Sequence, residues 1–112
     1  MEALLSRVGS IDLIQLQGRL DMAHIDSLGR QLMPLFEKPG HRIVMSLAEL
    51  TSITSVGLRL ILQLARHSQT VQGTVLLCEL QGHVLEVFET SGFTDILPIC
   101  LSRSEALRLA AP

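Results

Sequence analysis

Aromatic residues are scarce in this sequence, and their scarcity removes one group of functions. They form 3% of the 112 residues, with no tryptophan or tyrosine. Proteins that hold single-stranded nucleic acid stack bases on aromatic side chains. They also need a basic surface, whereas this chain has a net charge of −2. Nucleic acid is therefore not an expected partner.

Long hydrophobic runs are absent too. Hydrophobic residues make up 47% of the chain, yet no run reaches the roughly 20 residues of a membrane-spanning helix. The longest begins at Val56 and is interrupted by Arg59 and Gln63. Residues 1–10 have no basic cluster ahead of an apolar segment, so they do not resemble a secretory signal. We expect a cytoplasmic protein without direct membrane insertion, folded as a single domain over 1–112.

Motifs for catalysis and metal binding are lacking as well. Cys78 and Cys100 form no CxxC pair and lie in apolar runs, so we expect buried, reduced thiols. The four histidines lack the spacing of ligands to one metal. No glycine-rich phosphate loop is present, and no Ser/His/Asp or Cys/His set can be assembled. The sequence therefore predicts neither an enzyme nor a cofactor.

The chain does contain strand and helix patterns in alternation. Hydrophobic periodicity predicts strands at residues 4–8, 11–17, 41–47, 74–80 and 96–101 and helices at 22–38, 56–70, 83–90 and after Ser102. The first two strands are separated only by a tight turn and should form a hairpin. The order predicts an α/β fold with a mostly parallel central sheet, an N-terminal hairpin and about four helices.

Several local features refine this outline. Residues 18–21 and 48–52 are interpreted as connections, with Asp21 capping the helix that follows. Pro34 lacks an N–H, so a kink or a new turn is expected near residues 31–33. Pro98 places the last strand at an edge of the sheet. Ser102 and Glu105 have the spacing of a capping box.

The stretch 53–58 joins the most apolar strand pattern to the longest helix pattern. Thr54 and Ser55 therefore lie where a strand passes into a helix. A hydroxyl at this position can cap free backbone N–H groups, which is the simplest role for either residue. A phosphate there would meet the positive end of the helix dipole.

Five short segments, in this order, resemble those of a known family. They are Gly18-Arg19-Leu20-Asp21, Ile43-Val44-Met45-Ser46-Leu47, Thr54-Ser55-Val56-Gly57-Leu58, Ser91-Gly92-Phe93 and Glu105-Ala106-Leu107. Together they resemble the STAS domain, the fold of bacterial anti-sigma factor antagonists and of the cytoplasmic tails of sulphate transporters. The resemblance extends over residues 11–109.

The resemblance implies a bacterial phosphoprotein that regulates transcription by partner switching. In the antagonists, a serine kinase of the histidine-kinase-like ATPase type, which is the anti-sigma factor, phosphorylates the Ser directly after a motif Asp. The unphosphorylated form binds that kinase, and the phosphorylated form releases it. By position the acceptor is Ser55, with Thr54 as the alternative. A phosphatase is a further candidate partner.

Four positions depart from the family's usual residues. Thr54 stands in place of the motif Asp, and Val56 in place of a second hydroxyl residue. Ser46 takes the position of a polar or acidic residue that often ends the central strand, and Arg19 that of a Glu. Since the Asp is missing, a STAS scaffold subunit of a transport or signalling complex, which is not phosphorylated, is the alternative function. A small-molecule binder is a third hypothesis, for which the sequence offers no motif.

The partner surface is expected around the turn at residues 52–57. It includes the 20–21 loop and the exposed side of the following helix, whose apolar residues fill more than one stripe. The candidate partner-binding residues are Leu20, Asp21, Ser52, Thr54, Ser55, Val56, Gly57, Leu58, Arg59 and Gln63.

Overall fold

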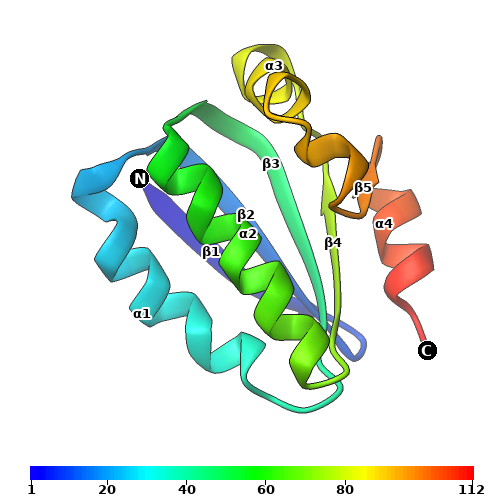
Figure 1. Ribbon diagram of the computed structural model, residues 1–112. Helices are drawn as coiled ribbons and strands as arrows, with labels where there is room; N and C mark the ends of the chain where they lie inside the picture. The colour runs from blue at the N-terminus through cyan, green and yellow to red at the C-terminus, as the bar shows by residue number, and fades with distance from the viewer.

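A five-stranded sheet in the order β1-β2-β3-β4-β5 organises the computed structural model, which describes residues 1–112 (Figure 1). The strands are β1 (Glu2–Val8), β2 (Ile11–Leu20), β3 (Arg42–Ile53), β4 (Thr74–Cys78) and β5 (Ile99–Cys100). The helices are α1 (Ile25–Phe36), α2 (Ser55–Thr70), α3 (Gly82–Thr90) and α4 (Arg103–Ala110), with 3₁₀ turns η1 (Met22–His24) and η2 (Phe93–Asp95). Only β1 and β2 are antiparallel, and the other pairs are parallel. The predicted α/β fold is confirmed.

The two faces of the sheet carry different cores. On one face, 19 buried residues from the sheet, α1, α2, α3 and the segment before β5 form a single cluster that includes Ile43 and Met45 of β3. Because side chains alternate along a strand, Val44 points to the other face. There it joins a smaller cluster of eight buried residues, including Ala106 and Ala110 of α4. Thus β3 is covered on both faces and lies between two parallel neighbours, as its apolar sequence predicts.

Strands β2 and β3 are both longer than the sequence predicts. Gly18, Arg19 and Leu20 belong to β2, and residues 48–52 belong to β3, so neither segment is the connection that was expected. The pairing shifts between Gln15 and Gln17 and again between Gly18 and Arg19. Each shift places an extra residue in β3, as in a β-bulge. The period-two pattern is lost, although Leu50 and Ile53 remain buried.

Helix α1 differs from its prediction at both ends. The segment predicted as one helix over residues 22–38 begins with the 3₁₀ turn η1, and the α-helix ends at Phe36. The helix continues through residues 31–33 and Pro34, so the expectation of a new turn there is wrong. Pro34 lies in the last turn of α1, where its missing N–H removes a single hydrogen bond of the helix.

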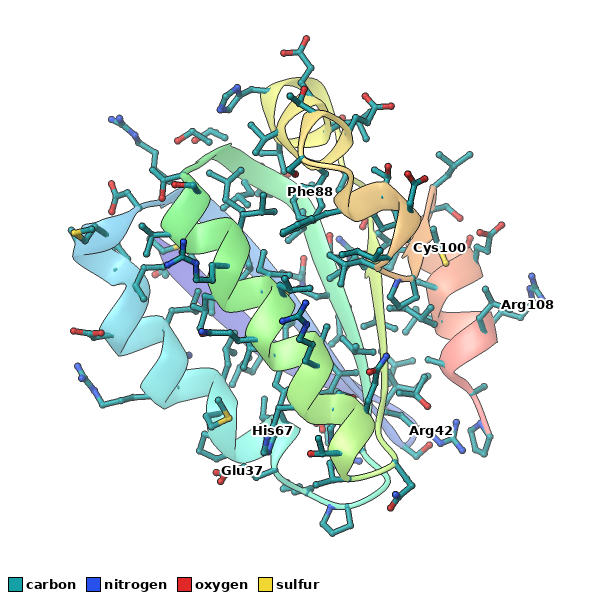
Figure 2. The ribbon with its side chains drawn as sticks, in the orientation of Figure 1. Glu37, Arg42, His67, Phe88, Cys100 and Arg108 are labelled. Atoms are coloured by element: carbon teal, nitrogen blue, oxygen red, sulfur yellow. The ribbon has the colours of Figure 1, made fainter.

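The C-terminal part keeps the predicted order with a shorter strand. The strand predicted over residues 96–101 is reduced to Ile99 and Cys100, at the edge of the sheet. Ser102 caps α4, because its Oγ accepts a hydrogen bond from the Glu105 N–H at 3.2 Å. Figure 2 shows Cys100 beside α4. Both cysteines are free and buried, as expected, and burial followed by the charge of Glu79 raises the pKa of the Cys78 thiol to about 12.

Candidate functional site at the start of α2

The turn between β3 and α2 is tied to the end of β2. Thr54 has an extended backbone and caps α2, because its Oγ1 accepts a hydrogen bond from the Gly57 N–H at 3.3 Å. The same hydroxyl donates to the Leu20 carbonyl oxygen at 3.4 Å. The Thr54 N–H donates to that oxygen too, at 3.0 Å. Thr54 therefore has the capping role that the sequence allowed, and both functions of its hydroxyl are in use.

Gly57 allows this close approach of helix and strand. A Cβ at this position would lie 2.7 Å from the Leu20 Cγ and 3.0 Å from the Leu20 carbonyl oxygen. It would also lie 3.2 Å from Cγ1 of Ile53. Leu20 is fully buried, and one of the two close atoms belongs to its backbone, so a shift of its side chain alone would not relieve the overlap. Glycine is required here by the packing of α2 against β2.

Ser55 is the first residue of α2 and differs from Thr54 in one decisive respect. Its side chain is exposed, and its hydroxyl forms no hydrogen bond within the chain. Residue 55 already has helical geometry, and the capping role belongs to Thr54. Of the two adjacent hydroxyls, only that of Ser55 is free to react or to contact another molecule.

Asp21 lies close to the same turn. Its Oδ1 accepts a hydrogen bond from the Ala23 N–H at 3.2 Å and lies 2.7 Å from Nδ1 of His24. The prediction that Asp21 caps the next helical segment is confirmed for η1. Met22, directly after it, is 74% exposed.

A groove of about 430 Å³ separates the start of α2 from α3. Its β3 and α2 side consists of Ile53, Ser55 and Leu58, and its opposite side of His83, Glu86, Val87, Thr90 and Ser91. Helix α3 is anchored by Phe88, which is fully buried and points from α3 towards the sheet (Figure 2). The sequence interpretation missed the contribution of α3. The three- and four-residue spacing of His83, Glu86 and Thr90 could have indicated a shared helix face, but not which element lies opposite.

The expected partner-binding residues divide into exposed and buried groups. Thr54, Ser55, Arg59 and Gln63 are exposed, and Asp21, Ser52 and Val56 are half-buried. Leu20, Gly57 and Leu58 are buried. The expectation of direct side-chain contact is wrong for these three, because their side chains or Cα pack inside the chain. They position the turn instead.

The apolar residues of α2 are largely covered by the chain itself. Leu58, Leu60, Ile61 and Leu64 belong to the large core. Leu62 and Ala65 are half-buried, pack against that core, and line a second cavity of about 450 Å³ next to β4. No broad apolar stripe remains exposed on this helix. The additional apolar residues of α2 therefore pack within the fold and leave no large apolar surface for a partner.

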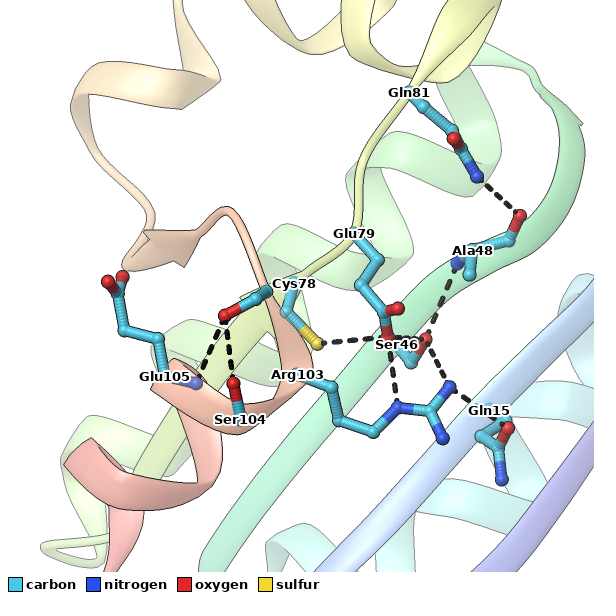
Figure 3. A network of polar contacts seen from close by, with 10 residues as sticks. Gln15, Ser46, Ala48, Cys78, Glu79, Gln81, Arg103, Ser104 and Glu105 are labelled. Carbon is cyan, nitrogen blue, oxygen red and sulfur yellow. Dashed lines mark hydrogen bonds and ion pairs between the residues drawn. The ribbon is translucent and has the colours of Figure 1, made fainter.

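A polar network lies on the opposite face of the sheet, between β3, β4 and α4 (Figure 3). Arg103 Nε donates to Glu79 Oε1 at 3.0 Å, and the Ser46 hydroxyl donates to the same oxygen at 2.8 Å. Burial raises the pKa of the Glu79 carboxyl, but the hydrogen bonds from Ser46 and Arg103 and the charge of Arg103 outweigh it, so the pKa lies below its ordinary value. The network fixes α4 to the sheet.

The structure contains no group of three or more His, Cys, Asp or Glu side chains placed to hold a metal ion. None of its helices is long and apolar enough to cross a bilayer. The fold and the turn at Thr54 and Ser55 define an α/β domain that presents a free serine hydroxyl at the start of its central helix.

Comparison with known proteins places this domain in a family. The STAS domain family matches residues 4–106. A protein of Bordetella bronchiseptica, BtrV, named as an anti-sigma factor antagonist, is 38% identical over 106 residues, which cover 95% of this chain and 91% of the relative. The chain belongs to the STAS domain family.

Solved structures agree with this fold. TM1081 of Thermotoga maritima, named as an anti-sigma factor antagonist, superposes with a TM-score of 0.87 at 18% identity, over 96% of this chain and 93% of that one. SpoIIAA of Bacillus in its phosphorylated form superposes with a TM-score of 0.74 at 20% identity, over 98% of this chain and 100% of that one. The resemblance to anti-sigma factor antagonists, first seen in short motifs, therefore extends to the whole fold.

Proposed function

We propose that this protein is an anti-sigma factor antagonist, switched by phosphorylation of Ser55. The observation that carries the proposal is the contrast between two neighbouring hydroxyls. Thr54 uses its hydroxyl to cap α2 and to bond the Leu20 carbonyl, whereas the Ser55 hydroxyl is exposed and unpaired. A kinase can reach Ser55 without opening the fold. The 38% identity to BtrV supports the same function.

The physical basis of the switch is a change of charge at the surface. In the transfer, the Ser55 oxygen forms a bond to the γ-phosphorus of ATP, the bond to ADP breaks, and the hydroxyl proton passes to a base of the kinase. The phosphate adds a charge of about −1.5 to −2 at neutral pH. The start of α2 tolerates this charge because of the helix dipole. A partner packed over Ser55 would lose contact and meet the new charge.

Thr54 takes over the capping role that the missing motif Asp could have had. Its Oγ1 supplies the oxygen that accepts the Gly57 N–H, so the start of α2 is capped without a carboxylate. Replacing the carboxylate with a hydroxyl also removes a negative charge next to the acceptor. Thr54 remains the alternative acceptor, although its phosphorylation would require breaking the cap.

The proposed partner is a serine kinase of the histidine-kinase-like ATPase type that acts as the anti-sigma factor, with a phosphatase as the resetting enzyme. In this scheme the protein has no catalytic role, is bacterial and works in the cytoplasm. The proposed partner surface consists of Asp21, Ser52, Thr54, Ser55, Val56, Arg59 and Gln63, together with the α3 side of the groove.

The proposal is tested by measuring the affinity for the kinase with substitutions at Ser55. Ser55→Asp should weaken binding by about 1–3 kcal/mol, because it places a charge in the contact surface. Ser55→Ala should leave binding nearly unchanged. Ser104→Asp is a matched control, since Ser104 is exposed in the first turn of another helix. Equal effects of the two Asp substitutions, or no effect of either, would contradict the proposal.

A scaffold function is the second candidate, favoured by the absence of the motif Asp at position 54. The same fold occurs as part of the murine anion transporter Slc26a9, with a TM-score of 0.78 at 11% identity over 94% of this chain and 18% of that one. This likeness concerns the fold alone. Stable association with transporter or scaffold subunits, with Ser55 unmodified throughout, would favour this function over the switch.

A further inference from the structure

Arg59 lies four residues after Ser55 on α2, and both side chains are exposed. Residues four apart lie on the same face of a helix, one turn from each other. An acidic group placed N-terminal to a basic group at this spacing is the more favourable orientation. A phosphate on Ser55 would therefore be formed within one helical turn of the Arg59 guanidinium.

Arg59 has no partner within the chain. The arginines that form ion pairs or hydrogen bonds are Arg7, Arg42 and Arg103. Helix α2 contains no Asp or Glu among its 16 residues, so no carboxylate of its own helix competes for the guanidinium. Arginine presents five N–H donors in a planar fork that matches phosphate oxygens. The guanidinium is thus free for an external anion or for a phosphate on Ser55.

The other charged groups near this phosphate belong to neighbouring elements. His83 and Glu86 of α3 line the groove opposite Ser55. The carboxylate of Asp21, before η1, already forms a hydrogen bond with His24. Glu86 is the only carboxylate that lines the groove, and it would repel a phosphate there. Among the residues of α2 and of the groove lining, Arg59 is the permanent cation nearest to Ser55 in sequence.

We propose that Arg59 binds the phosphate of phosphorylated Ser55. This inference rests on the proposed function and extends it. Phosphorylation would then place a negative charge on the proposed partner surface and would also engage Arg59, one of the cations of that surface.

The test is a ³¹P NMR titration of the chain with phosphoserine installed at position 55 during translation. A nearby cation stabilises the dianion, so removing it raises the second pKa of the phosphate. Arg59→Gln should raise this pKa by about 0.3 pH units. Arg66→Gln is the matched control, because Arg66 is exposed on the same helix, lacks a partner and carries the same charge. It should leave the titration unchanged.

Arg59→Lys provides a second variant that keeps the charge but loses the planar fork, and it should give an intermediate shift. The shift caused by Arg59→Gln should also shrink as salt is raised, since the pair is exposed. Equal titration of the Arg59→Gln and Arg66→Gln variants would overturn the inference. Because the phosphoserine is installed during translation, the result does not depend on a kinase. An Arg59 effect in a chain that no kinase modifies would contradict the proposed function while leaving the contact intact.

Discussion

Two strand-to-helix turns of this domain are capped in the same way, but the residue that follows each cap has a different role. At the start of α2, the Thr54 hydroxyl accepts from the N–H three residues on, at 3.3 Å. At the start of α4, the Ser102 hydroxyl does the same at 3.2 Å. The difference lies in the first helical residue after each cap, which is Ser55 in α2 and Arg103 in α4.

Arg103 is bonded to other residues of the chain, whereas Ser55 is not. The guanidinium of Arg103 bonds Glu79 at 3.0 Å, Gln15 at 3.3 Å and Ser46 at 3.4 Å, and so fixes α4 to the sheet. Ser55 makes no such contact and faces a groove. The cap is therefore a structural feature in both turns. Only at the start of α2 does a side chain without a partner, that of Ser55, follow the cap and indicate a functional surface.

The largest expected effect comes from Gly57→Ala, which disrupts the close approach of α2 to β2 at the α2 turn. The new Cβ would overlap Leu20 and Ile53, and overpacking of this kind costs about 2–3 kcal/mol. Gly29→Ala in α1 is the control, because its Cβ would meet only Leu60 Cδ1 at 3.9 Å, and it should stabilise by about 0.5–1 kcal/mol. Urea unfolding of both variants measures the difference. A neutral Gly57→Ala would show that α2 can move away from β2.

The next effect concerns Arg103 in the α4 turn. Arg103→Ala should lower the free energy of unfolding by about 1 kcal/mol at neutral pH, since the partners are partly exposed. The folded pKa of Glu79 is depressed. The stabilisation is therefore present above the unfolded pKa and lost as pH falls through the folded one.

Urea unfolding of wild type and Arg103→Ala at pH 7 and at a series of lower pH values tests this dependence. The difference between the two proteins should shrink as the pH falls and Glu79 takes up a proton. Arg108→Ala serves as a control on the same helix, because Arg108 is exposed and forms no ion pair. A difference that stays constant with pH would show that Glu79 is not the partner that matters.

Removing either of the two caps should lower the free energy of unfolding by nearly the same amount. Thr54→Ala and Ser102→Ala each remove one side-chain acceptor of a helix N–H, and each should cost about 1 kcal/mol. Thermal unfolding of the two variants checks the comparison. A cost confined to Ser102→Ala would mean that another group caps α2, and would weaken the assignment of Thr54.

Ser55→Ala should have the smallest effect on folding. Since the Ser55 hydroxyl is exposed and unpaired, its removal should change stability by less than about 0.5 kcal/mol. The same variant should abolish the phosphorylation switch. A clear loss of stability would contradict the claim that this hydroxyl is structurally unused.

The sequence predicts the order of elements because the periodicity is local. The apolar run of β3 and the helical spacing of α2 can both be recognised in the sequence. The extension of β3 to Ile53 cannot be recognised there, because two register shifts break the period-two pattern between Ser46 and Ile53. The continuation of α1 past Pro34 is not visible in the sequence either, because it depends on tertiary packing. Phe36, the last residue of α1, is fully buried in the core.

The site is only partly readable from the sequence. Thr54 and Ser55 are both residues that cap helices, so the sequence alone could not assign one as the cap and the other as the free hydroxyl. The assignment depends on the Leu20 carbonyl, which is 34 residues from Thr54. The groove residues of α3 are likewise brought to Ser55 by tertiary packing, and short motifs carry no information on that contact.

The most direct test of the account is site-resolved mass spectrometry after incubation with ATP and the histidine-kinase-like ATPase that the chain captures from its native cells. Wild type and Thr54→Ala should each gain about 80 Da on the peptide that contains Ser55. Ser55→Ala should gain nothing. Phosphate on Thr54 in the Ser55→Ala chain, or an unmodified wild-type chain that stays bound to its partner, would contradict the assignment of Ser55 as the switch.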